Sequence, residues 1–84
     1  MSQSKKKTYG KVADAILYFS KIIYESPEFE LPFTRQELAD LIGISRESAT
    51  RVLLKLREDG IVGVDDRFIS VSNIGMLQQI SRNG

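Results

Sequence analysis

A chain of 84 residues forms one small domain, and a composition of 42% hydrophobic and 27% charged residues is typical of a soluble globular protein without a membrane-spanning segment. The net charge of +1 indicates no particular partner, whereas the lack of cysteine and histidine excludes disulfides, thiol nucleophiles, the usual zinc sites and the ordinary neutral-pH general base. We therefore expect neither an enzyme nor a cofactor site in this domain, and the lack of a signal-peptide pattern predicts a cytoplasmic protein.

The N-terminal segment is basic. Residues 1–11 contain four lysines and no acidic residue. We predict a flexible basic arm over residues 1–8 and a folded domain over residues 9–84. Two interpretations of the arm remain open, because clustered lysines suit contact with nucleic-acid phosphates and are equally typical of a solvated terminus.

A long helix is predicted over residues 9–25. Its apolar side chains recur at spacings of three and four and form one stripe, which comprises Val12, Ala13, Ile16, Leu17, Ile23 and Tyr24. Phe19 falls beside this stripe, a position from which it could face a neighbouring domain. Pro27 ends the helix, because the residue before a proline is driven out of the helical region. Residues 28–32 are then expected to be a connector, and Phe33 to lie in a short extended segment.

Two further helices are predicted with a tight turn between them. Thr34 and Glu37 fit a capping box, in which each side chain accepts the other residue's amide proton. Gly43 can stop this helix in a left-handed conformation, and Ser45 is a good N-cap for a second helix over residues 45–59. Residues 34–59 thus have the pattern of a helix-turn-helix, whose second helix can enter the major groove of DNA, although plain helix packing produces similar turns.

The C-terminal third contains β-prone segments. Residues 61–64 and 68–71 are short and rich in β-branched residues, and the intervening Asp65, Asp66 and Arg67 suit a hairpin turn. We predict a wing over residues 61–71 and a short last helix over residues 73–80, where Gly75 weakens the helical pattern. The expected fold is mainly α with a small β-hairpin wing, that of a winged helix-turn-helix DNA-binding domain.

The exposed face of the second helix carries the functional hypothesis. At 100° per residue, Glu47, Thr50, Arg51 and Leu54 lie opposite the apolar positions, and Arg46 lies at the edge of this arc. Arginine can donate two hydrogen bonds to guanine, a carboxylate can accept from cytosine, and threonine offers a hydroxyl and a methyl group. An alternative is that Glu47 merely favours the helix N-terminus and pairs with Arg51, in an orientation that stabilises helices. Both roles are compatible.

The stretch from Phe33 to Val62, with Ser-Arg-Glu-Ser-Ala-Thr-Arg over residues 45–51, resembles the DNA-binding domain of the cyclic-AMP receptor and fumarate-nitrate regulator (Crp/Fnr) family. The resemblance implies that Arg46 and Arg51 contact guanines and that Glu47 contacts cytosine. It also implies phosphate contacts, which set the register on DNA, from Thr34, Gln36 and Ser48. At Thr50 and Leu54 the sequence departs from the cyclic-AMP receptor, so TGTGA-like and TTGAT-like half-sites both remain open, with a shared TG-A core.

Several expectations follow from the resemblance. Family members carry an effector-binding domain and a dimerisation helix before this domain, which implies a homodimer and an effector ligand that binds outside these 84 residues. RNA polymerase is a further candidate partner, whereas a membrane is not. The alternative function is a winged-helix protein-interaction module, which Leu54 alone favours on the exposed arc. A regulator of another helix-turn-helix family would differ chiefly in its operator.

Two groups of side chains have weaker signals. Arg67 at the predicted wing tip suits a phosphate contact or an ordinary solvated turn. The aromatic side chains have helical or strand spacing, which favours packing over base stacking.

Overall fold

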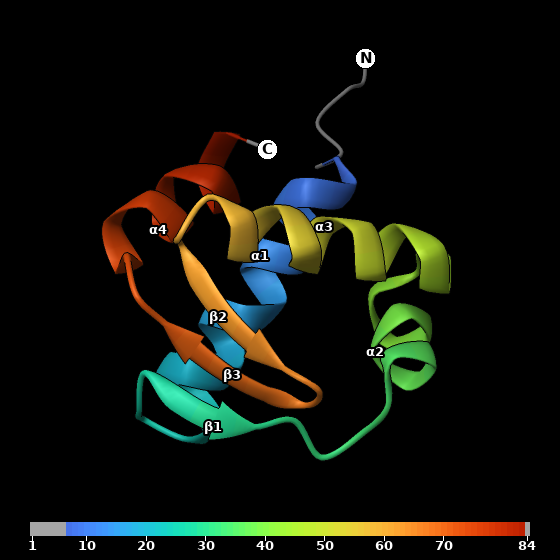
Figure 1. Ribbon diagram of the computed structural model, residues 1–84, viewed down its shortest axis with the longest axis horizontal. Coiled ribbons are helices and arrows are strands. Elements are labelled where there is room, and N and C mark those ends of the chain that lie inside the picture. The colour runs from blue at the N-terminus through green and yellow to red at the C-terminus, as the bar shows by residue number, and fades with distance from the viewer. Residues whose placement is uncertain (1–6, 84) are drawn as a thin grey trace.

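The computed structural model describes residues 7–83 and shows helices packed over one small sheet (Figure 1). The elements in chain order are α1 (Thr8–Tyr18), the π-helical turn η1 (Phe19–Ile23), β1 (Glu28–Glu30), α2 (Arg35–Ile42), α3 (Arg46–Glu58), β2 (Val62–Asp65), β3 (Phe68–Val71) and α4 (Ile74–Asn83). Residues 1–6 of the predicted basic arm lie outside the described residues, and α1 begins at Thr8. No helix within residues 7–83 has the length and apolar character needed to cross a membrane.

Helix α1 is the centre of the core. It packs against α2, α3 and α4, and Val12 and Ala13 are fully buried in it. Every other helix contributes buried apolar side chains, which include Leu38, Leu53, Leu56 and Leu77. The sheet adds Phe29, Val62 and Ile69 to the same cluster. One continuous core therefore fixes α2, α3 and the sheet relative to one another.

The sheet has a third strand that the sequence interpretation missed. The segment expected to be a connector forms β1, and the sheet order is β1-β3-β2. β1 pairs antiparallel with β3, with Phe29 opposite Ile69. Phe29 points into the core between two exposed glutamates, which is the alternation of a half-buried strand. The expected wing hairpin is confirmed as β2 and β3, whereas Phe33 lies in a bend and not in an extended segment.

The first helix also differs from its prediction. After Tyr18 it widens into η1, where the Tyr24 amide donates to the Phe19 carbonyl at 2.9 Å. The buried Ser20 hydroxyl donates to the Ser26 carbonyl at 2.7 Å, which closes the turn into β1. Phe19 is 9% exposed, and its ring centroid lies 5.4 Å from that of Phe33. The expectation that Phe19 could face a neighbouring domain is therefore wrong, because the π turn rotates it into the core.

The structure contains the expected helix-turn-helix, which α2 and α3 form. The Glu37 amide donates to Thr34 Oγ1 at 3.2 Å, and the Thr34 amide donates to Glu37 Oε1 at 2.9 Å. Gly43 ends α2 with a φ of 88°, and the Ser48 amide donates to Ser45 Oγ at 3.1 Å to begin α3. A turn this short, closed by caps on both sides, sets the angle between α2 and α3.

Helix α4 is longer than predicted. Asn73 Oδ1 accepts a hydrogen bond from the Met76 amide at 3.0 Å and so caps the helix, which runs to Asn83. Leu77 is fully buried against the core, and the Ser81 hydroxyl bonds to Asp14 on α1. Packing against α1 therefore outweighs the unfavourable helix propensity of Gly75.

Candidate nucleic-acid interface

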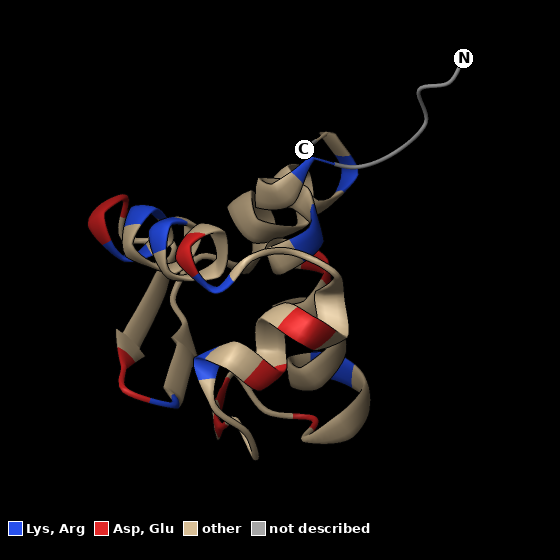
Figure 2. Ribbon diagram, turned by 90° about the vertical axis from the view of Figure 1, so that its right-hand side faces the viewer, with Lys and Arg blue, Asp and Glu red and all other residues tan. Residues whose placement is uncertain are grey.

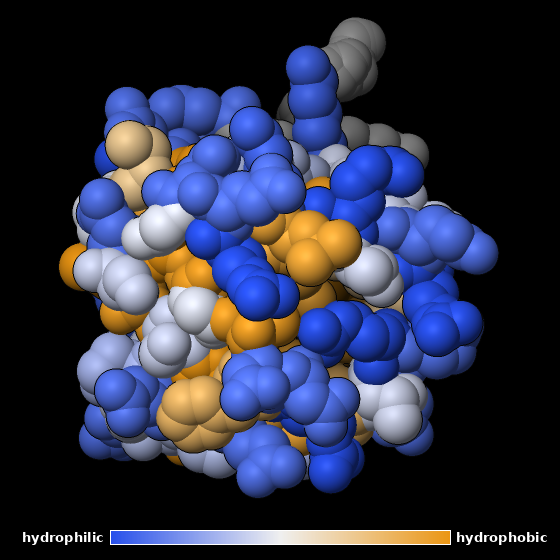
Figure 3. All heavy atoms as spheres, in the orientation of Figure 1, coloured by the Kyte–Doolittle hydropathy of each residue, from blue (hydrophilic) through white to orange (hydrophobic). Residues whose placement is uncertain are grey.

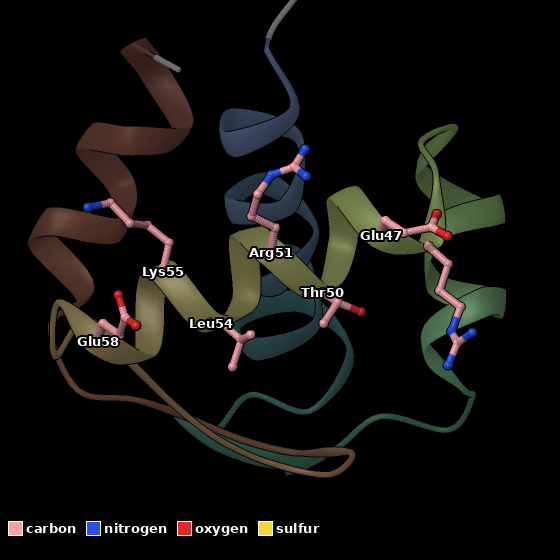
Figure 4. A pocket seen from close by; sticks show the side chains of 7 residues that line it. Glu47, Thr50, Arg51, Leu54, Lys55 and Glu58 are labelled. Carbon is pink, nitrogen blue, oxygen red and sulfur yellow. The ribbon is translucent and has the colours of Figure 1, made fainter.

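The outer face of α3 is polar and open. It forms a shallow hollow of about 620 Å³ whose lining comprises Arg46, Glu47, Thr50, Arg51, Leu54, Lys55 and Glu58. Figure 4 shows these side chains on two flanks of the helix, with Arg51 and Lys55 on one and Thr50 and Leu54 on the other. The structure therefore brings all four predicted base-contacting residues to one face.

The opposite face of α3 holds the helix in place. Its four buried residues are Ala49, Val52, Leu53 and Leu56, and Leu53 is 1% exposed. The adjacent Leu54 is 47% exposed. This sharp change between neighbours arises because one residue step turns a helix by about 100°. The predicted division of α3 into a packed face and a presented face is confirmed.

Arg51 lies at one end of a short chain of hydrogen bonds. Its Nη2 donates to Ser48 Oγ at 3.3 Å, and Ser45 Oγ donates to Ser48 Oγ at 2.9 Å. The alternative pairing of Glu47 with Arg51 does not occur among the described ion pairs, and Figure 4 shows the two side chains pointing apart. The described partner of the Arg51 guanidinium is therefore a neutral hydroxyl and not a carboxylate.

A second hollow, of about 690 Å³, lies between the start of α2, the start of α3 and the turn of the hairpin. Its lining comprises Thr34, Arg35, Gln36, Arg46, Asp66 and Arg67. Three of the four predicted phosphate-contacting residues therefore meet here, beside Arg46. The fourth, Ser48, lines neither hollow and is half-buried on α3. Gln36 Nε2 donates to Asp40 Oδ1 at 3.0 Å, one helical turn further on.

The hairpin turn is held by two contacts that the sequence interpretation missed. Arg35 Nη1 donates to the Asp66 carbonyl at 2.7 Å, and Arg67 Nη2 lies 3.6 Å from Glu30 Oε2. Asp66 takes a φ of 57°, a left-handed conformation that aspartate tolerates better than most residues. Figure 2 shows acidic and basic residues side by side at this turn. Neither contact has a local signal in the sequence, because each joins segments more than 30 residues apart.

The described residues contain no cluster of metal-ligating side chains. Within residues 7–83 no group of three acidic side chains is placed to hold a metal ion, and the whole chain lacks histidine and cysteine. The arrangement is that of a binding surface, with hydrogen-bond donors and acceptors on a convex helix.

Comparisons with known proteins agree with this geometry. The family model described as the Crp-like helix-turn-helix domain matches residues 10–80. The transcriptional activator protein FnrL of Cereibacter sphaeroides is 36% identical over 50 residues, which is 58% of this chain and 20% of that protein. The fumarate nitrate reduction regulatory protein of Klebsiella oxytoca is 26% identical over 83 residues, covering 93% of this chain and 33% of that protein.

Two solved structures have the same fold. FixK2 of Bradyrhizobium japonicum superimposes with a TM-score of 0.85 at 26% identity, over 92% of this chain and 39% of that one. The catabolite activator protein of Thermus thermophilus superimposes with a TM-score of 0.73 at 32% identity, over 90% of this chain and 34% of that one. The chain thus spans a fifth to a third of the length of these curated relatives.

The curated relatives are transcriptional regulators, which confirms that the chain is not an enzyme. The expected winged helix-turn-helix fold is confirmed as well. The chain belongs to the Crp-like helix-turn-helix family and is a DNA-binding domain of the Crp/Fnr type of transcriptional regulator.

Proposed function

We propose that this domain binds a specific DNA sequence by placing α3 in the major groove. The observation that carries the proposal is the outer face of α3, where Arg46, Glu47, Thr50 and Arg51 line one hollow on a helix fixed by its buried side. A major groove about 12 Å wide accepts an α-helix, and its base edges present the donors and acceptors that these side chains match.

The resemblance to the Crp/Fnr family implies a half-site with a TG-A core, and the side chains of α3 suit its guanine and cytosine edges. Arg46 and Arg51 donate two hydrogen bonds each to the O6 and N7 of guanines, and Glu47 accepts from the amino group of cytosine. Thr50 offers its hydroxyl or its methyl group to a neighbouring base. The hydrogen bond from Arg51 to Ser48 supports this role, because it orients the guanidinium without neutralising it.

The hollow between α2 and the hairpin turn suits the DNA backbone. Thr34, Gln36 and Arg67 bind phosphates there, and Ser48 binds one from α3. Thr34 Oγ1 accepts the capping hydrogen bond from Glu37 and still has its own proton to donate. The start of α2 adds backbone amides and the positive end of a helix dipole, both of which favour an anion.

The longer protein is proposed to act as a cytoplasmic homodimer. Two-fold related domains would meet half-sites about 34 Å apart on a palindromic operator, and one domain alone gains half of the contacts. We place an effector-binding domain, and with it any cofactor, outside these 84 residues, because the curated relatives are three to five times longer than the matched region. RNA polymerase is the proposed partner at the promoter.

A selection from randomised duplexes tests the proposal. The domain is fused to a dimerising coiled coil, and binding is selected at a stated salt concentration, because phosphate contacts make affinity strongly salt-dependent. We expect enrichment of an inverted repeat with TG-A half-sites one helical turn apart. Enrichment of an unrelated sequence would contradict the proposed base contacts, and no enrichment at all would contradict specific DNA binding.

A further inference from the structure

Leu54 is an apolar side chain in the middle of a polar binding face. It is 47% exposed, although its neighbour Leu53 is packed in the core. The other residues that line the hollow on α3 are charged or, like Thr50, polar. Figure 4 shows Leu54 pointing outward beside Thr50, one turn further along the helix. Figure 3, which views the side with α3 and the sheet, shows apolar atoms exposed between them with hydrophilic residues around them.

The chemistry of the major groove narrows what Leu54 can contact. The base edges there present hydrogen-bond donors and acceptors, and the only apolar group among them is the 5-methyl group of thymine. A leucine placed against a cytosine amino group or a guanine carbonyl would displace water from a polar group without replacing its hydrogen bond, which is costly. Against thymine the same side chain covers a methyl group instead.

We propose that Leu54 is a specificity-determining residue that recognises the methyl group of a thymine in the operator. The inference rests on the proposed function and extends it by one base. Leu54 follows Arg51 by three residues, or about 4.5 Å along the helix axis, and successive base pairs are about 3.4 Å apart, so the two side chains reach neighbouring base pairs when α3 runs along the groove. The thymine therefore lies next to the bases that Thr50 and Arg51 contact.

Replacement of thymine by deoxyuridine tests the inference, because it removes the methyl group and leaves every hydrogen-bonding atom in place. Each thymine of the duplex obtained by selection is replaced singly, on both strands, and affinity is measured by fluorescence anisotropy with the 84-residue chain. Loss of one buried methyl group is expected to weaken binding about fourfold at one position per half-site.

Three variants identify the side chain that contacts the methyl group. Leu54→Ala is expected to bind the thymine and deoxyuridine duplexes equally, and Leu54→Met to restore most of the difference. Thr50→Ser removes the methyl group of the half-buried Thr50 while keeping the hydroxyl, and it should leave the deoxyuridine effect at the Leu54 position intact. Because Leu54 and Thr50 lie on the outer face of α3, thermal unfolding of the three variants should match that of the parent chain.

The outcomes separate this inference from the proposed function. An unchanged affinity for all deoxyuridine duplexes overturns the role of Leu54 while leaving specific binding in place. The role of Leu54 is also overturned if Leu54→Ala retains the full deoxyuridine effect, or if Thr50→Ser abolishes that effect. A chain that selects no sequence overturns the proposed function itself.

Discussion

Helix α3 and the wing hairpin face the same side of the domain and carry their charges differently. On α3, the described hydrogen bond of Arg51 goes to a neutral serine, and neither Arg46 nor Arg51 forms an ion pair within residues 7–83. At the wing, Arg67 is paired with Glu30, and Asp65 and Asp66 precede it. Arg46 and Arg51 thus present positive charge on α3 without a described acidic partner, whereas Glu30, Asp65 and Asp66 outnumber Arg67 at the wing and leave it with a net negative charge. Under the proposed function, α3 determines which sequence is bound, and the wing determines how the domain fits the DNA backbone.

The largest expected effect concerns the support of α3. Leu53→Ala should lower the free energy of unfolding by about 2–5 kcal/mol, because it leaves a cavity in the core beneath the helix. Leu54→Ala, one residue further, should change it by less than about 0.5 kcal/mol, since Leu54 is exposed. Urea denaturation of the two variants measures the difference. Equal losses would show that the two faces of α3 are not distinct.

The second effect concerns the outer face of α3. Arg51→Ala should weaken binding to the selected duplex by about 1–3 kcal/mol, because it removes the two proposed hydrogen bonds to a guanine, and should change binding to a scrambled duplex far less. Arg82→Ala removes an exposed arginine from α4 and is the matched control. Anisotropy titrations with both duplexes check this. An equal loss of affinity for both duplexes would show that Arg51 contacts a phosphate and not a base.

The third effect concerns the contact by which Arg35 on α2 holds the wing in position. Arg35→Gln removes the donor to the Asp66 carbonyl and should weaken DNA binding by about 0.5–1 kcal/mol, the usual net contribution of one hydrogen bond. If Arg35 acts by positioning the wing, this loss should largely disappear in an Arg67→Gln background. Additive losses in the double variant would mean that Arg35 contacts DNA directly.

The smallest effect concerns the charge balance of the wing. Glu30→Gln removes the partner of Arg67 and should strengthen binding to selected and scrambled duplexes alike, by less than about 1 kcal/mol, with a steeper salt dependence. Glu28→Gln removes the other exposed acid of β1 and is the control, because Glu28 forms no described ion pair with Arg67. An affinity that does not respond to Glu30→Gln would place Arg67 away from the phosphates.

Features with a local cause were predictable from the sequence. The capping box at Thr34, the left-handed Gly43 and the N-cap at Ser45 each depend on residues within one helical turn. The two faces of α3 follow from the helical periodicity of its apolar residues alone. The residues of its outer face could therefore be predicted from the sequence.

Features that depend on distant partners were not predictable. β1 exists because β3 offers it an edge, and its register pairs Glu28 with Ser70. The contact from Arg35 to Asp66 spans 31 residues and involves a backbone carbonyl, which no side-chain pattern reveals. The π turn that buries Phe19 is likewise selected by packing against Phe29 and Phe33.

The strand β1 has a mechanical consequence. It follows the end of η1 after four residues and pairs with β3, the central strand of the sheet, so the hairpin is hydrogen-bonded to the chain that leaves the first helical segment. Bending the hairpin alone would break this ladder and expose Phe29. A displacement applied at α1 is therefore transmitted to the wing and, through the shared core, to α3. We therefore expect α1, α3 and the wing to move together as one rigid body.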